Sequence, residues 1–428
     1  MRVRFLGSVT ALLVLGAAVA PPGVGAANSL GLSATYKVKA NIGWAAASFD
    51  VRSTARVTNS SGEAVDALSF NLLPAKIGRM TLTEVLVDGT PASVVVEGQT
   101  LTVGLPGGLP ADAEALVEIA YSALFNTTVG DKNWMLAKLN KTITAYRWIP
   151  WLSRAVKFKR PNFGDPFVTA TSSEVRVTLT SDKSLTYATT GKRLSVSGNT
   201  QTFVARKVRD FNFAASPRYS VLKGSKDGIK IRIMYRTLPP ETMLRWARRS
   251  LGRYAAQVGP YPYSHFFVAQ TEGGSGMESP GMIWIPRSTR SGNLGYLIAH
   301  ETAHQWFYAL LGSDQAKEPY ADEGPADFLA RDLVQKRRSP KCTLDTLDGT
   351  VYDYSSSCYY ETIYIRGGNY LHKYRLRVGE DAFWAGMRAY YEEYRFKLGG
   401  TPELWAALDA AAGESGGGHQ ALFPKYFE

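Results

Sequence analysis

Two histidines four residues apart form the chemically most informative pattern in the sequence. His300 and His304 stand in the segment His-Glu-Thr-Ala-His, with Glu301 directly after the first histidine. Residues four apart lie one above the other on the same helix face, so both imidazoles can point at a single ion. Glu301 neighbours a ligand without lying in line with it, which suits a general base for a metal-activated water. The pattern predicts a zinc site.

A third ligand is expected from the next helix. Eighteen residues, 305 to 322, separate His304 from Glu323. A turn between 312 and 319 would return the chain, so that Glu323 completes three protein ligands and leaves a fourth position for water. The alternative is a helix that carries two histidines and a glutamate by chance. Because the chain has only 5 histidines and two fall in this pattern, we favour the metal.

The motif and its spacing to Glu323 resemble the signature of the M1 family of zinc aminopeptidases, which are gluzincins. The resemblance implies one Zn²⁺ per chain on His300, His304 and Glu323, with Glu301 as the base, and peptide substrates with a free N-terminus. Asp322 stands where the family usually has Asn, and Pro325 lies in the first helical turn. Asp327, one turn beyond Glu323, would either hold a ligand histidine or be a solvated or capping residue.

A glycine-rich segment, residues 273 to 281, resembles the family's Gly-x-Met-Glu-Asn motif. The glutamate of that motif accepts hydrogen bonds from the α-amine of the substrate, so Gly276, Met277 and Glu278 are implied to bind substrate. An ammonium group that enters a cleft needs a negative partner there. Ser279 replaces the family's Asn. The alternative is a glycine-rich turn with a solvated glutamate.

The segment from Tyr360 to Gly367 resembles the family's Tyr-x-Lys-Gly motif. On that resemblance Tyr364 donates a hydrogen bond to the oxyanion of the tetrahedral intermediate, and Arg366 replaces the lysine. The chain has 23 tyrosines. Outside this motif, Tyr364 would be interpreted as a buried core residue.

The beginning of the chain has the layout of a secretory signal peptide. Arg2 and Arg4 precede an apolar run over residues 5–20, and small residues follow at 24–27. We therefore expect a signal peptide over 1–26 and a secreted, extracellular protein. A retained anchor is the alternative, but the run is short for a membrane span and Pro21-Pro22 ends it. No later segment is apolar enough to predict a span in the mature protein.

Composition predicts a folded, basic protein. The 428 residues are 45% hydrophobic and carry a formal net charge of +12, with basic clusters at 157–160, 245–253 and 337–341. These clusters would either associate with anionic cell-wall polymers or membrane surfaces, or form a solvated face. No basic motif interleaved with aromatics predicts nucleic-acid binding. Cys342 and Cys358 would form a disulfide in an exported chain, or remain free thiols.

The periodicity of apolar residues predicts a multidomain β plus α/β (α+β) fold. Residues 27–236 alternate with period two and predict an antiparallel β-sandwich or saddle. Residues 237–428 begin with a helical period, and the resemblance implies a thermolysin-like, mainly helical metallopeptidase domain without the family's C-terminal helical domain. The zinc helix is predicted from 293 to 312. The aromatic segment 146–151 would line the pocket or pack the sandwich against its neighbour.

These expectations predict an exported zinc aminopeptidase that hydrolyses the N-terminal peptide bond. A zinc endopeptidase or another hydrolase on the same scaffold is the closest alternative, because an open cleft need not require a free amine. A non-catalytic surface-binding module, stabilised by zinc, is the alternative from another class.

Overall fold

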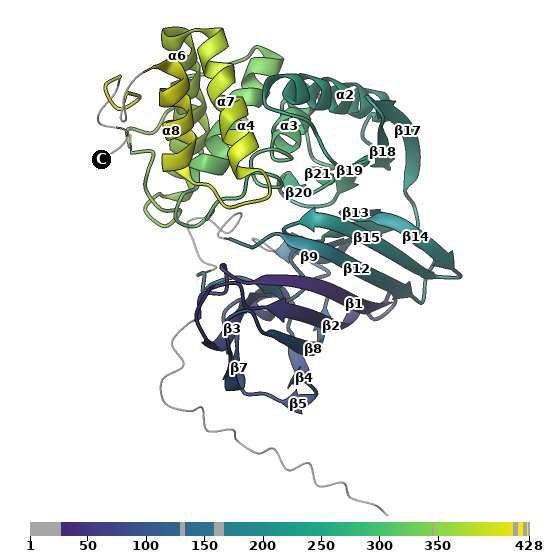
Figure 1. Cartoon of the computed structure of the whole chain (residues 1–428). Helices are drawn as coiled ribbons and strands as arrows, with labels where there is room; N and C mark the ends of the chain where they lie inside the picture. Colours follow the sequence, from purple (N-terminus) through teal and green to yellow (C-terminus); the bar gives the residue numbers. More distant parts are fainter. Residues whose placement is uncertain are drawn as a thin grey trace, which may run out of the picture.

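The computed structural model describes residues 27–128, 133–157, 167–344, 346–413, 418–422 and 426. The predicted signal peptide, residues 1–26, lies outside the described residues, as do residues 158–160 of the first basic cluster. A β-rich part at one end of the molecule carries a helical part at the other (Figure 1). The fold class predicted from the sequence is confirmed.

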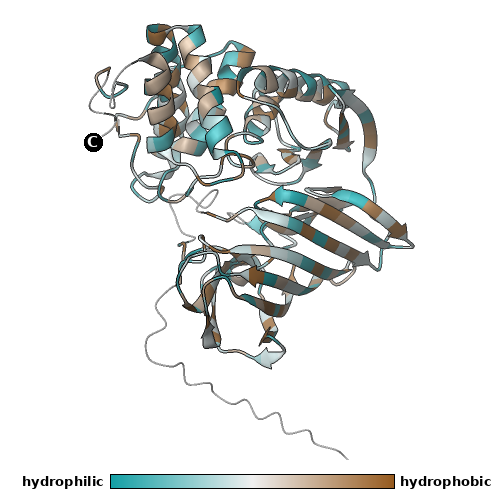
Figure 2. Ribbon diagram, viewed as in Figure 1, coloured by the Kyte–Doolittle hydropathy of each residue, from teal (hydrophilic) through white to brown (hydrophobic). Residues whose placement is uncertain are grey.

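The large sheet of the β-rich part has eight strands in the order β14-β15-β12-β1-β2-β8-β4-β5. Strands β1 and β12 pair in parallel, and the other neighbours pair antiparallel. Their bounds are β1 (Ser33–Gly43), β2 (Ser48–Thr58), β4 (Thr81–Val87), β5 (Thr90–Pro91), β8 (Glu114–Leu124), β12 (Ser172–Ser181), β14 (Lys192–Ser197) and β15 (Thr200–Val208). Hydrophobic and hydrophilic residues alternate along these strands (Figure 2), as expected for a sheet with one buried face.

Two four-stranded sheets complete the β-rich part. One has the order β13-β16-β10-β9 and the other β11-β3-β7-β6. They comprise β13 (Thr186–Thr189), β16 (Phe213–Ser216), β10 (Thr142–Ala145), β9 (Leu136–Leu139), β11 (Trp151–Leu152), β3 (Val65–Asn71), β7 (Thr100–Leu109) and β6 (Val94–Glu97), with α1 (Pro74–Ile77) and the 3₁₀ turn η1 (Asn133–Met135) between strands. One continuous core joins the large sheet to these two.

A separate five-stranded sheet, in the order β17-β18-β19-β21-β20, underlies the helical part. It comprises β17 (Ser220–Lys226), β18 (Ile229–Tyr235), β19 (His265–Thr271), β20 (Met277–Ser279) and β21 (Met282–Pro286). Helix α2 (Pro240–Gln257) connects the parallel strands β18 and β19. The domain boundary predicted at 236/237 remains a prediction. Strands β17 and β18 belong to the five-stranded sheet of the helical part, which favours an earlier boundary near 219.

The remaining helices cover that sheet and one another (Figure 1). They are α3 (Ser291–Ala303), α4 (Tyr320–Val334), α5 (Ser356–Tyr359), the π-helix η2 (Tyr360–Arg366), α6 (Gly367–Val378), α7 (Glu380–Tyr394) and α8 (Thr401–Ala412). The prediction that the zinc helix continues to residue 312 is wrong. Helix α3 ends at Ala303, and the backbone amides of Gln305 and Trp306 donate to the carbonyl oxygens three residues earlier. Tyr308 then takes a positive φ of 122°, which turns the chain. Within the described residues no helix combines the length and apolar character needed to cross a bilayer.

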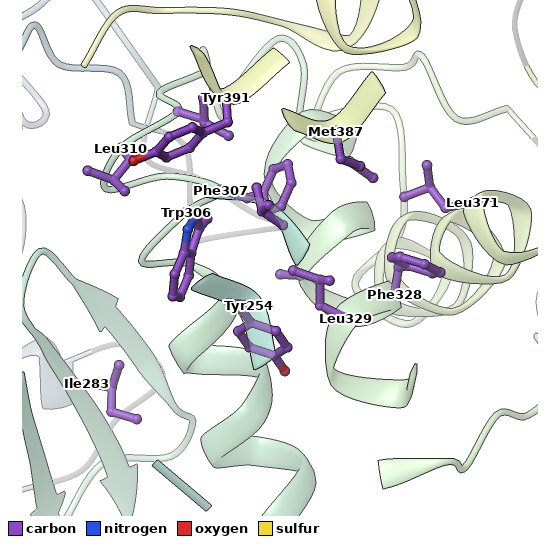
Figure 3. Packing of buried hydrophobic residues seen from close by; sticks show 14 of the residues in the cluster. Tyr254, Ile283, Trp306, Phe307, Leu310, Phe328, Leu329, Leu371, Met387 and Tyr391 are labelled. Atoms are coloured by element: carbon purple, nitrogen blue, oxygen red, sulfur yellow. The ribbon is translucent and has the colours of Figure 1, made fainter. Parts of the chain in front are cut away.

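The core of the second part is built from helices and strands that surround α3. Tyr254, Trp306 and Leu329 pack there from α2, the turn after α3, and α4 (Figure 3). Their polar atoms are satisfied within the core. The Tyr254 hydroxyl donates to Ala299 O at 3.1 Å, and Trp306 Nε1 donates to Gly259 O at 2.7 Å. The first of these contacts ties α2 directly to α3.

Cys342 and Cys358 form the predicted disulfide, with their Cα atoms 5.4 Å apart. The bridge closes a loop by joining Cys342 to Cys358 of α5, the helix directly before η2, which carries Tyr364. Arg366 Nη2 also donates to Cys342 O at 2.6 Å, so the loop is tied to the end of η2. The loop is therefore fixed to the segment that carries Tyr364.

Leu329→Ala should lower the free energy of unfolding by about 2–5 kcal/mol, because it opens a cavity in a close-packed core. Leu329 is 1% exposed on α4. Leu376→Ala is the matched control, since Leu376 is 67% exposed on α6 and the same helix-propensity change applies. Chemical denaturation of both variants measures the difference, and an equal effect would contradict this packing.

Candidate metal centre and substrate cleft

Three electron-pair donors converge between α3 and α4. His300 Nε2 lies 3.2 Å from His304 Nε2 and 3.2 Å from Glu323 Oε2, and His304 Nε2 lies 3.3 Å from the same oxygen. Tetrahedral ligands at zinc distances of 2.0–2.1 Å stand about 3.3 Å from one another. Two turns of α3 and the first turn of α4 thus bring the sequence-predicted ligands together at a spacing that fits zinc.

The chemical state of these donors also fits a cation. His300, His304 and Glu323 are 5%, 1% and 3% exposed, and Glu323 Oε2 accepts no hydrogen bond among the described residues. A buried polar atom without a partner costs about 1–3 kcal/mol. Burial by itself would raise the pKa of Glu323, but the two histidines hold it below its usual range. Glu323 is therefore a carboxylate, the form that binds metal.

Asp322 orients His304. His304 Nδ1 lies 2.7 Å from Asp322 Oδ1 and 3.0 Å from Phe307 O, which leaves Nε2 to face the centre. Gln315 Nε2 in turn donates to Asp322 Oδ2 at 2.7 Å. Burial lowers the pKa of His304, but Asp322 and Glu323 raise it well above its usual value. The sequence marked Asp322 only as a departure from the family pattern.

Asp327 does not hold a ligand histidine, and it is neither solvated nor a cap. It is 0% exposed, and it accepts hydrogen bonds from Tyr296 Oη at 2.5 Å and from Arg331 Nε at 2.7 Å. One turn beyond Glu323, its carboxylate reaches the earlier turn of α3 that carries Tyr296. The interpretation of Asp327 as a histidine partner was therefore wrong.

Glu301 lies in the same cleft, next to Gly276. Glu301 is 5% exposed, and burial raises the pKa of its carboxyl well above the usual value, against the opposing effect of His304. A Cβ atom on residue 276 would stand 2.1 Å from Glu301 Oε1. Only glycine allows this close approach. The structure thus places Gly276 against the carboxylate of Glu301 as well as in the lining of the cleft.

Glu278 faces Glu301 and His304 from β20. Each of these three residues offers an atom within 4.8 Å of the other two. The Tyr146 hydroxyl donates to Glu278 Oε1 at 3.3 Å, and burial raises the pKa of Glu278 to about 7. Met277, which also lines the cleft, is 4% exposed and belongs to a cluster of buried apolar residues that includes Trp134 and Trp284. Glu278 is therefore not the solvated glutamate of the alternative interpretation.

The strand that carries Glu278 is clamped from two sides. The side-chain amide of Asn212 donates to Ser279 Oγ and, at 2.9 Å, to Asp210 Oδ2. Gln305 Nε2 donates to Ser279 O at 2.8 Å, while its Oε1 accepts from Gly281 N at 2.7 Å. Sequence reasoning missed Asn212 and Gln305, because the contacts join residues distant along the chain.

Tyr364 reaches the centre from the π-helix η2. Its hydroxyl donates to Glu323 Oε1 at 2.5 Å, and its ring stacks on His300 with centroids 5.4 Å apart. The aromatic segment 146–151, predicted to line the pocket or to pack the sandwich against its neighbour, contributes no residue to the lining of the cleft. Tyr146 supports Glu278, whereas Trp148 is buried in the β core.

All eight sequence-predicted site residues line one cleft of about 610 Å³. Further lining comes from Trp134 of η1, from Asn293, Tyr296 and Leu297 of α3, and from the segment around α5. The cleft therefore combines an acidic inner end with aromatic walls. Its size suits a segment of a peptide.

Comparison with known proteins supports the same fold. No family model matches the chain. An M1 zinc metallopeptidase from Deinococcus radiodurans is 17% identical, with a TM-score of 0.71 over 93% of this chain and 95% of that one. A second structure of that protein, described as bound to the substrate Tyr-Ser-Ala, gives a TM-score of 0.67 at 18% identity, over 94% and 95% of the two chains. The chain thus has the two-domain fold of M1 zinc metallopeptidases, as the sequence resemblance predicted.

Curated relatives match over shorter segments. Human glutamyl aminopeptidase is 24% identical over 156 residues, which cover 31% of this chain and 16% of that protein. Aminopeptidase N of Lactococcus lactis is 24% identical over 148 residues, which cover 28% and 17%. Tricorn protease-interacting factor F2 of Thermoplasma acidophilum is 24% identical over 206 residues, which cover 40% and 26%. The chain thus spans about a quarter or less of the length of these relatives.

Asp322→Ala should weaken zinc binding about 10- to 100-fold, because His304 loses the acceptor that orients its ring. Asp327→Ala is the matched control on the same helix, and its zinc affinity should stay within about threefold of wild type. Competition with a chromophoric chelator measures both constants. Equal losses in the two variants would contradict the assignment of Asp322 as the histidine's partner.

Proposed function

We propose that this chain is an exported zinc-dependent aminopeptidase that hydrolyses the N-terminal peptide bond of peptides. The observation that carries the proposal is the shared cleft, in which Glu278 and Glu301 offer atoms within 4.8 Å of one another and of His304. A carboxylate that binds an ammonium group thus lies beside one that can move a proton. Export rests on the predicted signal peptide.

His300, His304 and Glu323 would hold the zinc ion, which supplies a Lewis acid and lowers the pKa of water. Their spacing and burial support this ligand set. Asp322, itself held by Gln315, keeps His304 oriented through Nδ1 and leaves Nε2 for the metal. The fold's likeness to M1 zinc metallopeptidases supports the same metal.

Glu301 is the proposed proton carrier. It accepts a proton from the attacking water as the water oxygen bonds to the scissile carbonyl carbon, and it delivers that proton to the leaving amine as the C–N bond breaks. Burial favours the protonated form that exists between these two events. The carboxyl group lies close to the backbone of Gly276, where a side chain would collide with it.

Glu278 and Tyr364 are proposed to hold the two ends of the reacting unit. Glu278, supported by Tyr146, accepts hydrogen bonds from the substrate's α-ammonium, so that only the first peptide bond reaches the centre. Tyr364 donates a hydrogen bond from its hydroxyl to the carbonyl oxygen as negative charge develops there. To do so it exchanges its hydrogen bond to Glu323 for one to the substrate.

Glu301→Gln should lower kcat on an aminoacyl-coumarin substrate by about 10²–10⁴-fold, because the proton carrier is lost. Zinc content should stay at one per chain, since Glu301 is not one of the three converging ligands. Metal analysis and initial rates on the same sample measure both. A folded, zinc-loaded wild-type chain without turnover on a broad peptide library would instead favour a non-catalytic binding module.

Glu278→Gln should reduce kcat/KM for peptides with a free N-terminus by about 10- to 100-fold, because a charge-assisted hydrogen bond is lost. N-acetylated peptides should be poor substrates of the wild type. Glu272→Gln is the matched control, since Glu272 pairs with Arg236 at 3.1 Å outside the cleft lining. Comparable cleavage of acetylated and free peptides by the wild type would favour a zinc endopeptidase.

A further inference from the structure

A second concave surface lies on the helical part, formed by α2, the end of α4 and α6. Two hollows of about 560 and 490 Å³ share Arg253, Asp332 and Gln335, and neither shares a lining residue with the substrate cleft. We call their combined lining the basic groove. Its cations are Lys226, Arg248, Arg249, Arg253, Arg331, Arg337 and Arg375.

Cations outnumber acids in the basic groove. Asp332 is shared by three guanidinium groups, those of Arg375 at 2.9 Å, Arg253 at 3.6 Å and Arg337 at 3.8 Å. Glu380 also pairs with Arg375, at 3.4 Å, but its side chain is 63% exposed. Asp332, whose side chain is 15% exposed, therefore faces three guanidinium groups, and even with Glu380 counted the positive charges at the centre of the groove are in excess.

Two further arginines have no carboxylate partner among the described residues. Arg248 Nε donates to Ser225 O at 3.0 Å, and Arg249 lies 4.7 Å from the ring centroid of Trp246. Both are exposed on α2. Lys226 does have a partner, Asp227 at 3.2 Å, and that carboxylate is 66% exposed. The α2 rim of the groove thus offers free guanidinium donors.

Burial and neighbouring arginines lower the pKa values of Arg337 and His372, whereas, against the effect of burial, Asp327 raises the pKa of Arg331. Burial lowers the pKa of Arg337 to about 10; Asp332 opposes that shift, whereas Arg375 and Arg331 add to it. Burial also lowers the pKa of His372, and Arg337 and Arg375 lower it further. Added positive charge is disfavoured here, which is the electrostatic condition that attracts an anion.

Two glycines bring the rim cations together. A Cβ atom on residue 252 of α2 would stand 2.5 Å from Lys226 Cε, and one on residue 224 of β17 would stand 2.9 Å from Arg248 Nη2. The side chain of Lys226 on β17 thus packs against Gly252 of α2, and that of Arg248 on α2 packs against Gly224 of β17. The close packing of α2 on β17 depends on this absence of side chains.

We propose that the basic groove binds a linear polymer that carries phosphate groups. Guanidinium groups present forked donors that match phosphate oxygens, and a row of them suits repeated phosphates. A flat membrane would touch mainly the rim, whereas Arg375 and Arg337 line the groove with side chains that are only 8% and 20% exposed. No Phe, Tyr or Trp occurs among the described lining residues, so the groove lacks the aromatic surfaces on which nucleic-acid bases stack.

This proposal gives a location to the cell-surface association expected from the sequence. Clusters 245–253 and 337–341, distant along the chain, each contribute lining residues here. Asp332, at the centre of the groove, lies nine residues after Glu323 on α4. That separation is about 14 Å along the helix axis. A polymer in the groove would leave the substrate cleft open.

The test uses labelled inorganic polyphosphate and the zinc-loaded full chain, with binding followed by fluorescence anisotropy at about 50 and 200 mM salt. The double variant R248E/R249E should weaken binding by about tenfold or more and reduce its salt dependence. The double variant K192E/R193E is the control, because it makes the same change in net charge on the exposed strand β14. Its affinity should stay within about twofold of wild type.

Equal weakening in both double variants would overturn the proposal, since net charge alone would then explain binding. Thermal unfolding of each variant shows whether the fold is kept, and the milder R248K/R249K should retain most of the affinity. Binding to phosphatidylglycerol vesicles or to single-stranded DNA as tight as to polyphosphate would also overturn it. None of these measurements depends on peptidase activity.

Discussion

The close approach of three donor atoms, two imidazole nitrogens and a carboxylate oxygen about 3.2 Å apart, is the constraint on which the rest of the helical part depends. Buried polar atoms with lone pairs repel one another, so they stay this close only when a cation binds them or a rigid frame holds them. The frame consists of α3 and α4, packed through a core that reaches from Tyr254 to Leu371 (Figure 3). Because that core is close-packed, small shifts of either helix would be costly.

A chain of hydrogen bonds connects this frame to the β-rich part. Arg147 Nη2 donates to Gln315 Oε1 at 3.2 Å, Gln315 donates to Asp322, and Asp322 holds His304. Arg147 Nη2 also donates to Tyr308 Oη at 3.1 Å, and that hydroxyl donates to Asp210. Together with the clamp on Ser279, these contacts make the β-rich part a structural support of the cleft.

Four acids at the centre differ in what surrounds them. The imidazoles hold the pKa of Glu323 low, whereas burial raises the pKa values of Glu278 and Glu301. Asp322 faces a histidine nitrogen and an amide donor instead of the cleft. Burial and partners thus give identical functional groups different properties, and the roles proposed for them, metal binding, proton transfer, amine binding and histidine orientation, rest on these differences.

What the sequence determined by itself was local or motif-based. The spacing of His300, Glu301 and His304 matches a helical period of 3.6, and period-two alternation predicted the strands. For the two cysteines the sequence left a disulfide and free thiols both open. Only the tertiary structure decided that Asp322, and not Asp327, orients His304. It also decided that β18 belongs to the five-stranded sheet and that two basic clusters meet around Asp332. Such contacts join residues far apart in the chain, and they depend on how helices and sheets pack, which local periodicity does not encode.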